Sequence, residues 1–511
     1  MKDSIDRRSI LKVALAAMVL SGLAHAGIAE TLQPNRPTDR PNIIVVMADD
    51  MGFSDLGCYG GEIKTPTIDR LAKEGVRFSQ FYNCNVCGPS RASLMTGCYP
   101  WDVGVKTWDG MLNDRGATVI QLLKTNGYET CVVGRLDNIT TDNWHEPAQI
   151  ARYCDRFLGT ATGGAGNYFK EAKGTPWFKD GKRWERPVGA YSTDLISDFV
   201  ADFIEGSAGS DKPFFIYMSH YAPHWPLQAK EKDIAPYLEL YKKQERKTLM
   251  QARLQRQINM GLIPEGTILD DSMVYAKPVA GGYLSIERMA INAAMVESID
   301  HSLANTMASL KKAGKLDNTL ILVLSDNGAS NQGMSSRKGK VPKGVRPGSM
   351  NTFLFQGSAL AAMNNTPFRY YKLSDYEGGI ASPLIAWWPS GLKSKGRISH
   401  RLSHIADIMP TCLELAGVSY PSQFEGRNVI PLAGKSFVSV IEDTEGDQNN
   451  HEVLLFRKAV RDKDWKLVMQ NPDNPELYHI SKDRNERENL AAQFPDKVQQ
   501  LKKLHSTIYS E

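Results

Sequence analysis

The sequence predicts an α/β fold: a large, mostly parallel mixed sheet sandwiched by helices, with a small C-terminal α+β subdomain that contains an antiparallel sheet. Four short runs predict buried strands of the large sheet, since each is apolar at nearly every position and ends in polar residues. These runs are 42–47, 130–133, 214–218 and 319–324. Helical patterns separate them, and such alternation is typical of a parallel sheet covered on both faces.

Three regions between and after these strands have a composition or an apolar pattern that indicates their structure. Residues 296–310 place apolar side chains on one helical face, with Gly314 as the expected C-cap. Residues 227–282 begin with long charged helical sequence, which suggests an insertion over the sheet edge that serves as a lid or a substrate wall. Residues 332–365 are rich in Gly, Ser, Asn, Lys and Arg, which predicts a long surface loop.

The C-terminal part of the sequence has shorter apolar runs. Residues 453–456, 458–461 and 465–469 predict short strands, and 488–506 predict a terminal helix. We therefore expect a catalytic domain over residues 40–418 and a C-terminal subdomain over 419–511.

The N-terminus predicts an export signal over residues 1–29. Charged residues including Arg7 and Arg8 precede an apolar run at 13–23, and a small-residue cleavage site follows it. The paired arginines resemble a twin-arginine signal, with an ordinary secretory signal as the alternative. We expect an exported protein, periplasmic or extracellular, without stable membrane insertion, because no other run is long and apolar enough to span a bilayer.

Charge and cysteine content narrow the possible partners. The formal net charge is +4, and no basic run or aromatic-interleaved basic patch occurs, so we expect no nucleic-acid partner. Seven cysteines are an odd number for an exported protein, which suggests a thiol with another role. Cys84 and Cys87 have the spacing of a redox or zinc pair, but the sequence has no second pair to complete a zinc site.

Polar side chains follow all four predicted strands. Asp49 and Asp50, Arg135, His224, and Asp326 with Asn327 all come at or after strand ends. Ligands of open α/β sheets bind beyond the carboxyl ends of the strands, so these side chains predict one site. Three carboxylates and an amide form an all-oxygen set that suits Ca²⁺ or Mg²⁺; the alternative is that both pairs only make turns.

The run Cys87-Gly88-Pro89-Ser90-Arg91 is the most specific motif. Pro89 fits the first turn of a helix, so Cys87 is expected at a helix N-terminus, where backbone N–H groups favour an anion. Arg91 lies about one turn further on and faces the same anion if the helix forms.

With this motif the chain resembles the type I, formylglycine-dependent sulfatases, arylsulfatase-like members of the alkaline phosphatase superfamily. The resemblance runs from about residue 40 to 495 in the order that the family shows. The matching segments are 40–44, 49–52, 65–72, 87–97, 223–226, 325–328, Lys372 with 377–379, and 477–480 with 488–490.

The resemblance implies a sulfuric ester hydrolase that cleaves carbohydrate or aryl sulfates. Cys87 would be oxidised to formylglycine by a separate formylglycine-generating enzyme, and the hydrated aldehyde would attack sulfur and later expel sulfate. The family's metal set maps onto Asp49, Asp50, Cys87, Asp326 and Asn327, around Ca²⁺ or else Mg²⁺. The expected catalytic residues are Cys87, Arg91 holding the hydrate, Arg135, Asp137, His224 protonating the leaving oxygen, and Lys372 gripping sulfate, with Asp326 a candidate base.

One segment departs from the family. Where members commonly read Gly-Lys-Trp-His, this chain reads Gly134-Arg135-Leu136-Asp137. Arg135 can still pair with sulfate, but as a planar fork rather than a point charge. Asp137 replaces a histidine expected to help expel sulfate, and either Asp137 or His145 takes that role.

Two other functions remain open from the sequence. A phosphomonoesterase or phosphodiesterase on the same scaffold usually carries Ser or Thr as its nucleophile, which Cys87 argues against. A sugar-sulfate binding protein derived from a sulfatase is suggested only by Arg135 and Asp137. Trp108, Trp225 and Tyr371 could stack on a sugar or pack in the core, and the substrate itself is not encoded in a motif.

Overall fold

The structure is a computed structural model that describes residues 40–107, 110–137, 154–160, 163–164, 166–270, 285–331, 340–444 and 451–509. The chain from Pro41 onward forms one compact unit. The predicted export signal, Trp108 and His145 lie outside the described residues, and the division at residue 418 stays a prediction.

Ten strands form the large sheet of the described residues, in the order β11-β2-β10-β9-β1-β8-β4-β5-β6-β7. Its central strands β9, β1, β8, β4 and β5 are parallel, and β10 and β6 run antiparallel to their inner neighbours. The bounds are β1 Asn42–Asp49, β2 Val76–Phe78, β4 Glu129–Arg135, β5 Arg156–Thr160, β6 Trp177–Lys179, β7 Lys182–Trp184, β8 Phe214–Pro223, β9 Thr319–Ser325, β10 Leu384–Trp387 and β11 Arg397–Ser399.

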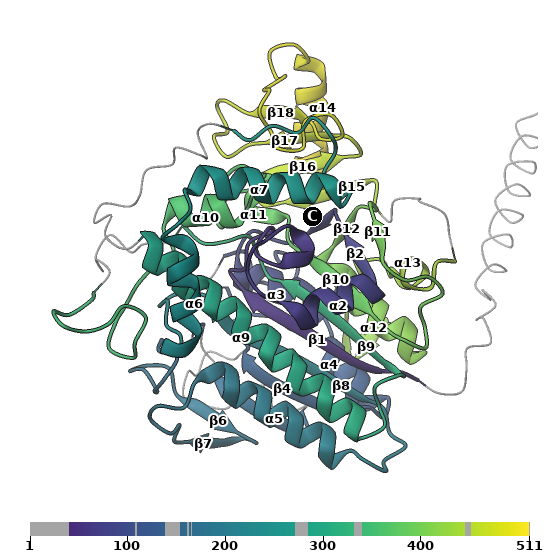
Figure 1. Ribbon diagram of the computed structural model, residues 1–511. Helices are drawn as coiled ribbons and strands as arrows, with labels where there is room; N and C mark the ends of the chain where they lie inside the picture. Colours follow the sequence, from purple (N-terminus) through teal and green to yellow (C-terminus); the bar gives the residue numbers. More distant parts are fainter. Residues whose placement is uncertain are drawn as a thin grey trace, which may run out of the picture. The chain divides into compact units, whose positions relative to one another are not determined.

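Helices cover both faces of this sheet (Figure 1). The described helices are α2 Pro66–Glu74, α3 Cys87–Thr96, α4 Val119–Thr125, α5 Ser192–Gly206, α6 Glu231–Tyr241, α7 Arg246–Asn259, α9 Ser285–Lys312, α10 Ser358–Asn364, α11 Glu377–Ile380, α12 Ile408–Ala416, α13 Val438–Glu442 and α14 Pro495–Tyr509. Strand β1 shows why two layers form: Ile44 and Val46 join the core that includes α5 and α9, whereas Ile43 and Val45 join the core that includes α4 and α12. The alternation buries both faces, and the predicted α/β sandwich is confirmed.

The C-terminal residues form a separate four-stranded antiparallel sheet, β15-β16-β17-β18. Its strands are Val453–Phe456, Ala459–Asp462, Trp465–Val468 and Glu476–His479, and the last was not predicted. Helix α14 begins at Pro495, later than the predicted residue 488. The side chain of Asn489 accepts backbone N–H groups from Leu477 and Ala491, so this stretch is tied to β18 instead of being helical.

The predicted insertion contains α6 and α7. Arg253 on α7 is fully buried and forms ion pairs with Asp55, at 3.2 Å, and Glu62, at 2.8 Å. Both acids lie in the loop that follows β1. The described helices of the insertion are thus anchored to the core, next to the segment that leaves the sheet edge.

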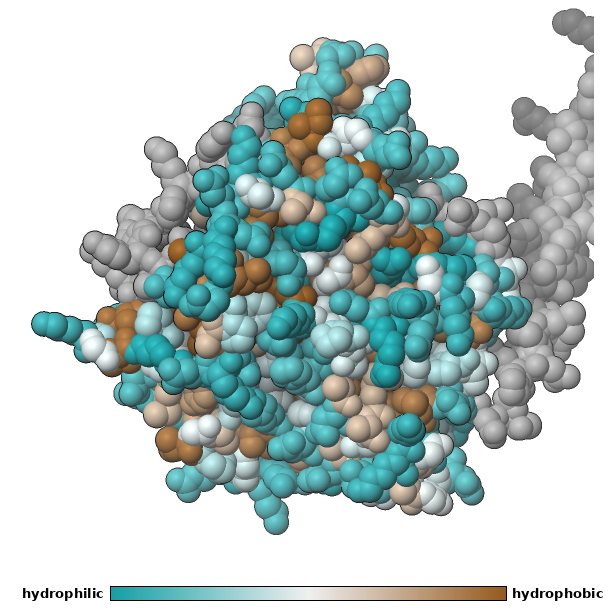
Figure 2. Space-filling view, viewed as in Figure 1, coloured by the Kyte–Doolittle hydropathy of each residue, from teal (hydrophilic) through white to brown (hydrophobic). Residues whose placement is uncertain are grey.

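The hydropathy of the surface is mixed on the side that Figure 2 shows. On the face shown in Figure 2, hydrophobic residues occur in small groups among hydrophilic ones. In the part of the chain that the structure describes, no helix has the length and apolar character needed to cross a membrane.

The remaining short elements complete the inventory of the described residues. They are the 3₁₀ helices Gly57–Tyr59 and Ile405–Asp407 and the paired strands β3 Phe81–Tyr82 with β12 Ser403–His404 and β13 Gln423–Phe424 with β14 Arg427–Asn428.

Candidate active site

The polar residues at the ends of β1 and β9 lie side by side. The two strands are parallel neighbours with Ala48 opposite Ser325, so both chains leave the sheet at the same level. The backbone N–H of Asp50 donates to Asp326 Oδ1 at 3.2 Å, and Asn327 Nδ2 donates to Asp50 Oδ1 at 2.6 Å. Asp50 has a φ of 68°, a strained conformation for a residue with a side chain, which turns the chain sharply after Asp49.

Three oxygen atoms in this cluster are buried and have no hydrogen-bond partner among the residues that the structure describes. They are Asp49 Oδ1, Asp50 Oδ2 and Asn327 Oδ1. Burial and the neighbouring charge of Asp49 raise the pKa of Asp326, as expected where carboxylates crowd together. Orphaned oxygens of this kind are costly unless a cation occupies the space between them, so the residues fit a divalent ion with oxygen ligands.

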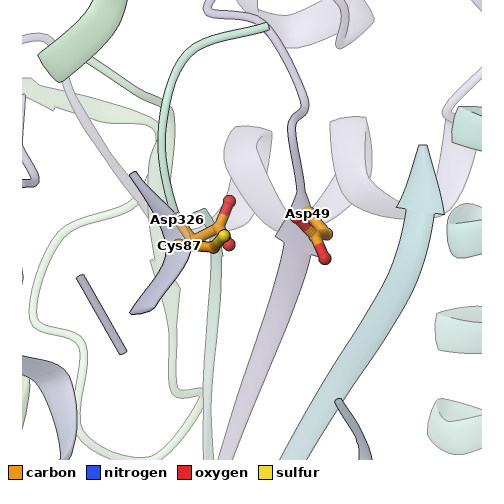
Figure 3. A group of neighbouring side chains, drawn as sticks. All are labelled: Asp49, Cys87 and Asp326. Atoms are coloured by element: carbon orange, nitrogen blue, oxygen red, sulfur yellow. The ribbon is translucent and has the colours of Figure 1, made fainter. Parts of the chain in front are cut away.

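Cys87 begins α3, as the sequence predicts, with Val86 as an extended N-cap residue. Its sulfur lies with Asp49 and Asp326 in a group whose possible ligand atoms are all within 4.8 Å of one another, and Figure 3 shows these side chains approaching one space. Burial raises the pKa of the Cys87 thiol to about 12, although Arg135 and Lys372 oppose the shift. The unmodified thiol is therefore protonated near neutral pH and is a poor nucleophile.

Arg91 is completely buried one turn into α3. Its guanidinium donates to Asp326 Oδ2 at 2.8 Å and lies 3.5 Å from Asp49 Oδ2. Tyr217 and Ser219 of β8 accept further hydrogen bonds from it. Within the described residues, the hydrogen bonds of Arg91 reach Asp326, the side chains of β8 and the carbonyl oxygen of Arg135 in β4, and not the Cys87 sulfur.

Lys372 and His224 approach the cluster from the side of Asp50. Lys372 Nζ donates to Asp50 Oδ1 at 2.7 Å, and His224 Nε2 lies 3.6 Å from Asp50 Oδ2. Although burial opposes it, the charges of Asp50 and Asp49 raise the pKa of Lys372, which stays an ammonium. Burial lowers the pKa of His224, with Asp50 opposing. Its Nδ1 lies 2.7 Å from the carbonyl oxygen of Trp225 and must carry a proton to make that hydrogen bond.

Arg135 connects the thiol to the carboxylates. One guanidinium nitrogen forms a close ion pair with Asp49 Oδ2, and the other donates to Cys87 Sγ at 3.0 Å and to Asp137 Oδ2 at 3.1 Å. Asp137 is 5% exposed and has a φ of 59°. A Cβ at Gly163 would lie 2.7 Å from Asp137 Oδ1, so a larger residue there would have to displace that carboxylate.

The structure thus brings together all of the predicted site residues that it describes, and two more that sequence reasoning missed. Tyr217 and Ser219, which hold Arg91, lie two positions apart in the buried strand β8 and therefore share one face. That spacing of polar groups in a buried strand is the signal that would have found them. The seven cysteines are all free, so Cys84 and Cys87 form no disulfide.

Comparison with known proteins gives matches along nearly the whole chain. Residues 41–418 match the model of the Sulfatase family, and residues 368–510 match that of the N-sulphoglucosamine sulphohydrolase C-terminal region. An uncharacterised sulfatase of Schizosaccharomyces pombe is 31% identical over 90% of this chain and 92% of its own length. An arylsulfatase of Klebsiella aerogenes is 28% identical over 84% of this chain and 96% of its own length.

Solved structures resemble this protein over a similar share of the chain. The crystal structure of Ps i-CgsB in complex with k-i-k-neocarrahexaose has a TM-score of 0.67 and 25% identity, and the match covers 91% of each chain. The sequence and the fold therefore both have relatives that match most of the chain.

Proposed function

The chain belongs to the sulfatase family, of type I within the alkaline phosphatase superfamily, and is a sulfuric ester hydrolase; from this premise we propose that it cleaves carbohydrate or aryl sulfates with a formylglycine made from Cys87. One observation carries the proposal. Cys87 sits at the start of a buried helix with its sulfur against Arg135 and grouped with Asp49 and Asp326. A protonated thiol has little use in such a position, whereas a hydrated aldehyde there would face both cationic and carboxylate groups.

The substrate class rests on the relatives. One relative is an arylsulfatase, and a structural neighbour was solved in complex with a neocarrahexaose. Both relatives together support sulfate esters of sugars or of phenols as substrates, without favouring one of the two classes.

We propose that Asp49, Asp50, Asp326, Asn327 and the modified Cys87 hold a Ca²⁺, or else a Mg²⁺. Three orphaned buried oxygens and the oxygen-rich donor set support this. When bound, the ion would neutralise sulfate oxygens and favour deprotonation of a nearby hydroxyl. Arg91 holds two of the carboxylates in place through its ion pairs and so acts as a positioning residue.

The reacting groups can be assigned around that set. Formylglycine supplies, as its hydrate, one hydroxyl to attack sulfur and a second that allows sulfate to leave without water attacking sulfur. Lys372 and Arg135 are the cations available to bind sulfate oxygens. His224 would protonate the leaving oxygen from Nε2, and the nearby Asp50 favours its charged form.

The proton that must be removed when sulfate leaves needs a base. One nitrogen of Arg135 donates to both Asp137 Oδ2 and Cys87 Sγ, which holds the Asp137 carboxylate on the same side of Arg135 as the sulfur. His145 is the alternative candidate, outside the described residues. We propose Asp137, because its carboxylate is already held in the site.

The test is direct. In protein made in a host with a formylglycine-generating enzyme, the peptide containing Cys87 is expected to be about 18 Da lighter than the unmodified peptide, since CH₂–SH becomes CHO. The same protein is expected to hydrolyse 4-nitrophenyl sulfate, and Cys87→Ala to abolish turnover, while Cys84→Ala, three residues away, retains it. An unmodified Cys87 in active protein, or faster turnover of 4-nitrophenyl phosphate, would contradict the proposal.

We also propose that the chain is exported through its first 29 residues. The paired arginines and the apolar run support the twin-arginine route. Cell fractionation with and without Arg7→Lys and Arg8→Lys tests this: retention of the doubly substituted chain inside the cell is expected, and unchanged export refutes that route.

A further inference from the structure

We propose that Tyr370 and Leu373, on either side of Lys372, form a subsite for the sugar ring that carries the sulfate. The inference rests on the proposed function, since it takes Lys372 as a sulfate-binding residue. It goes further by naming the carbohydrate as the substrate class and the residues that would select it.

The first observation is that the side chains of Tyr370 and Leu373 are strongly exposed. Among the described residues, five large apolar side chains are strongly exposed: Val188, Ile268, Tyr370, Leu373 and Phe494. Two of these five lie within two positions of Lys372, at 41% exposed for Tyr370 and 44% for Leu373, while Lys372 itself is 3% exposed. Exposed apolar side chains gathered beside a buried charged group are typical of a ligand site.

The second observation is a fixed, strained backbone. Tyr370 and Leu373 have φ values of 60° and 73°, which side-chain-bearing residues rarely adopt. The N–H of Lys372 donates to Ala329 O at 3.0 Å and that of Leu373 to Asn85 O at 2.9 Å. The segment is therefore tied to the chain after β9 and to the chain before α3, the two elements that carry Asn327 and Cys87. Such strain persists where function requires it and contacts impose it.

The third observation is that neighbouring side chains hold the Tyr370 ring, among them that of Tyr371, whose ring centroid lies 6.1 Å away. Its centroid lies 4.5 Å from that of Tyr376, and the guanidinium of Arg369 lies 5.2 Å from the Tyr370 ring and 5.3 Å from the Tyr376 ring. Arg369 in turn donates to Tyr478 Oη at 3.1 Å. A ring that is fixed in this way loses little conformational entropy when a ligand packs on its exposed part.

The fourth observation is an amide-rich loop beside the same segment. Gln470 Nε2 donates to the carbonyl oxygen of Leu373 at 3.5 Å. Gln470 lies in the connection between β17 and β18, in which Asn471 and Asn474 are exposed. Apolar and aromatic surface next to side-chain amides matches a sugar, which has apolar C–H faces and a rim of hydroxyl groups.

Tyr370 and Leu373 are close to Lys372 along the chain. Consecutive Cα atoms are 3.8 Å apart, so the Cα atoms of Tyr370 and Leu373 lie within about 8 Å of that of Lys372. Both side chains therefore leave the backbone near the residue that we propose binds the sulfate.

The experiment compares sugar binding with sulfate binding. Full-length protein with converted Cys87 is assayed for sulfate release from a panel of monosulfated hexoses and N-acetylhexosamines, and inhibition by inorganic sulfate is measured in parallel. Tyr370→Ala is expected to raise KM for the best sugar about 10-fold, with kcat within about 2-fold and the inhibition constant of sulfate unchanged. Tyr370→Phe, which keeps the ring, should restore KM, and Phe494→Ala is the control for loss of an exposed aromatic ring elsewhere.

The results separate the two proposals. If the unsubstituted protein hydrolyses neither the sugars nor 4-nitrophenyl sulfate, the proposed function fails. If it cleaves only the aryl sulfate, or if Tyr370→Ala and Leu373→Ala leave KM for the sugar unchanged, the subsite is refuted and the function stands. A parallel rise in KM and in the inhibition constant of sulfate also refutes it, since the loop would then act only by placing Lys372.

Discussion

The orphaned oxygens at the ends of β1 and β9 predict that a divalent cation stabilises the folded chain by an amount that can be calculated. Asp49 Oδ1, Asp50 Oδ2 and Asn327 Oδ1 lack partners, and an unfolded chain would not hold them together. At a free concentration 100 times the Kd, an ion that binds only the folded state adds about 2.7 kcal/mol to the free energy of unfolding. The compact unit from Pro41 to Glu511 has about 470 residues, whose unfolding entropy is about 1 kcal/mol per kelvin. The expected rise in Tm is therefore about 3 °C.

The assay is a thermal unfolding scan of the full-length protein in chelator and then in increasing Ca²⁺ or Mg²⁺, with turnover of 4-nitrophenyl sulfate measured on the same samples. Asp326→Asn, which removes a proposed ligand, should lose most of the Tm rise and the cation dependence of turnover. Asp211→Asn, at an exposed carboxylate, is the matched control and should keep both. If Tm and turnover are the same in chelator and in either ion, these oxygens do not form a cation site.

The remaining predictions concern the site and its support. Asp137→Asn is expected to lower kcat roughly 10- to 100-fold with a smaller effect on kcat/KM, measured by stopped-flow release of the phenol, which should show a burst; unchanged kcat would exclude Asp137 as the base. Arg253→Met leaves the buried Asp55 without its cation and Glu62 with only Arg256, at 3.8 Å, so the free energy of unfolding in urea is expected to fall by roughly 3–5 kcal/mol, and a change under 1 kcal/mol would contradict the anchoring role of α7. Burial, with Glu377 adding to the effect, raises the pKa of Glu486 from 4.5 to about 7. Its contribution to stability is full below about pH 4.5 and is lost as pH rises through about 7, by roughly 3 kcal/mol at most; Glu486→Gln should remove that part of the pH dependence, and an unchanged profile would show that the group does not titrate there.

The long buried strands were predictable, and the short strands β2 and β11 were not. β1, β8 and β9 each bury both faces, so their sequences are apolar almost throughout. By contrast, β2 and β11 have three residues each and pair with strands hundreds of positions away. A three-residue run carries little periodic signal, and its pairing depends on tertiary packing that no local pattern reports.

The site was predictable as a set of residues, but its internal pairing was not. Polar residues at the ends of parallel strands must meet at one edge, which is enough to bring Asp49 and Asp326 together. Whether Arg91 turns toward the thiol or toward the carboxylates depends on the helix's rotation and on acceptors on β8. The contact of Arg135 with both Cys87 and Asp137 likewise requires the left-handed turn at Asp137, which an aspartate in the sequence permits but does not specify.

Helix α3 is buried along its entire length, and Cys87 is only 5% exposed. An enzyme that oxidises this thiol must bring its own reactive centre to the sulfur, and the folded chain offers almost no surface for that. If Cys87 is converted as proposed, the conversion must therefore take place on the nascent or unfolded chain, before α3 is buried. A chain that folds first would keep its thiol, so the active fraction of a preparation would depend on the rate of oxidation relative to that of folding, and slower folding would increase that fraction.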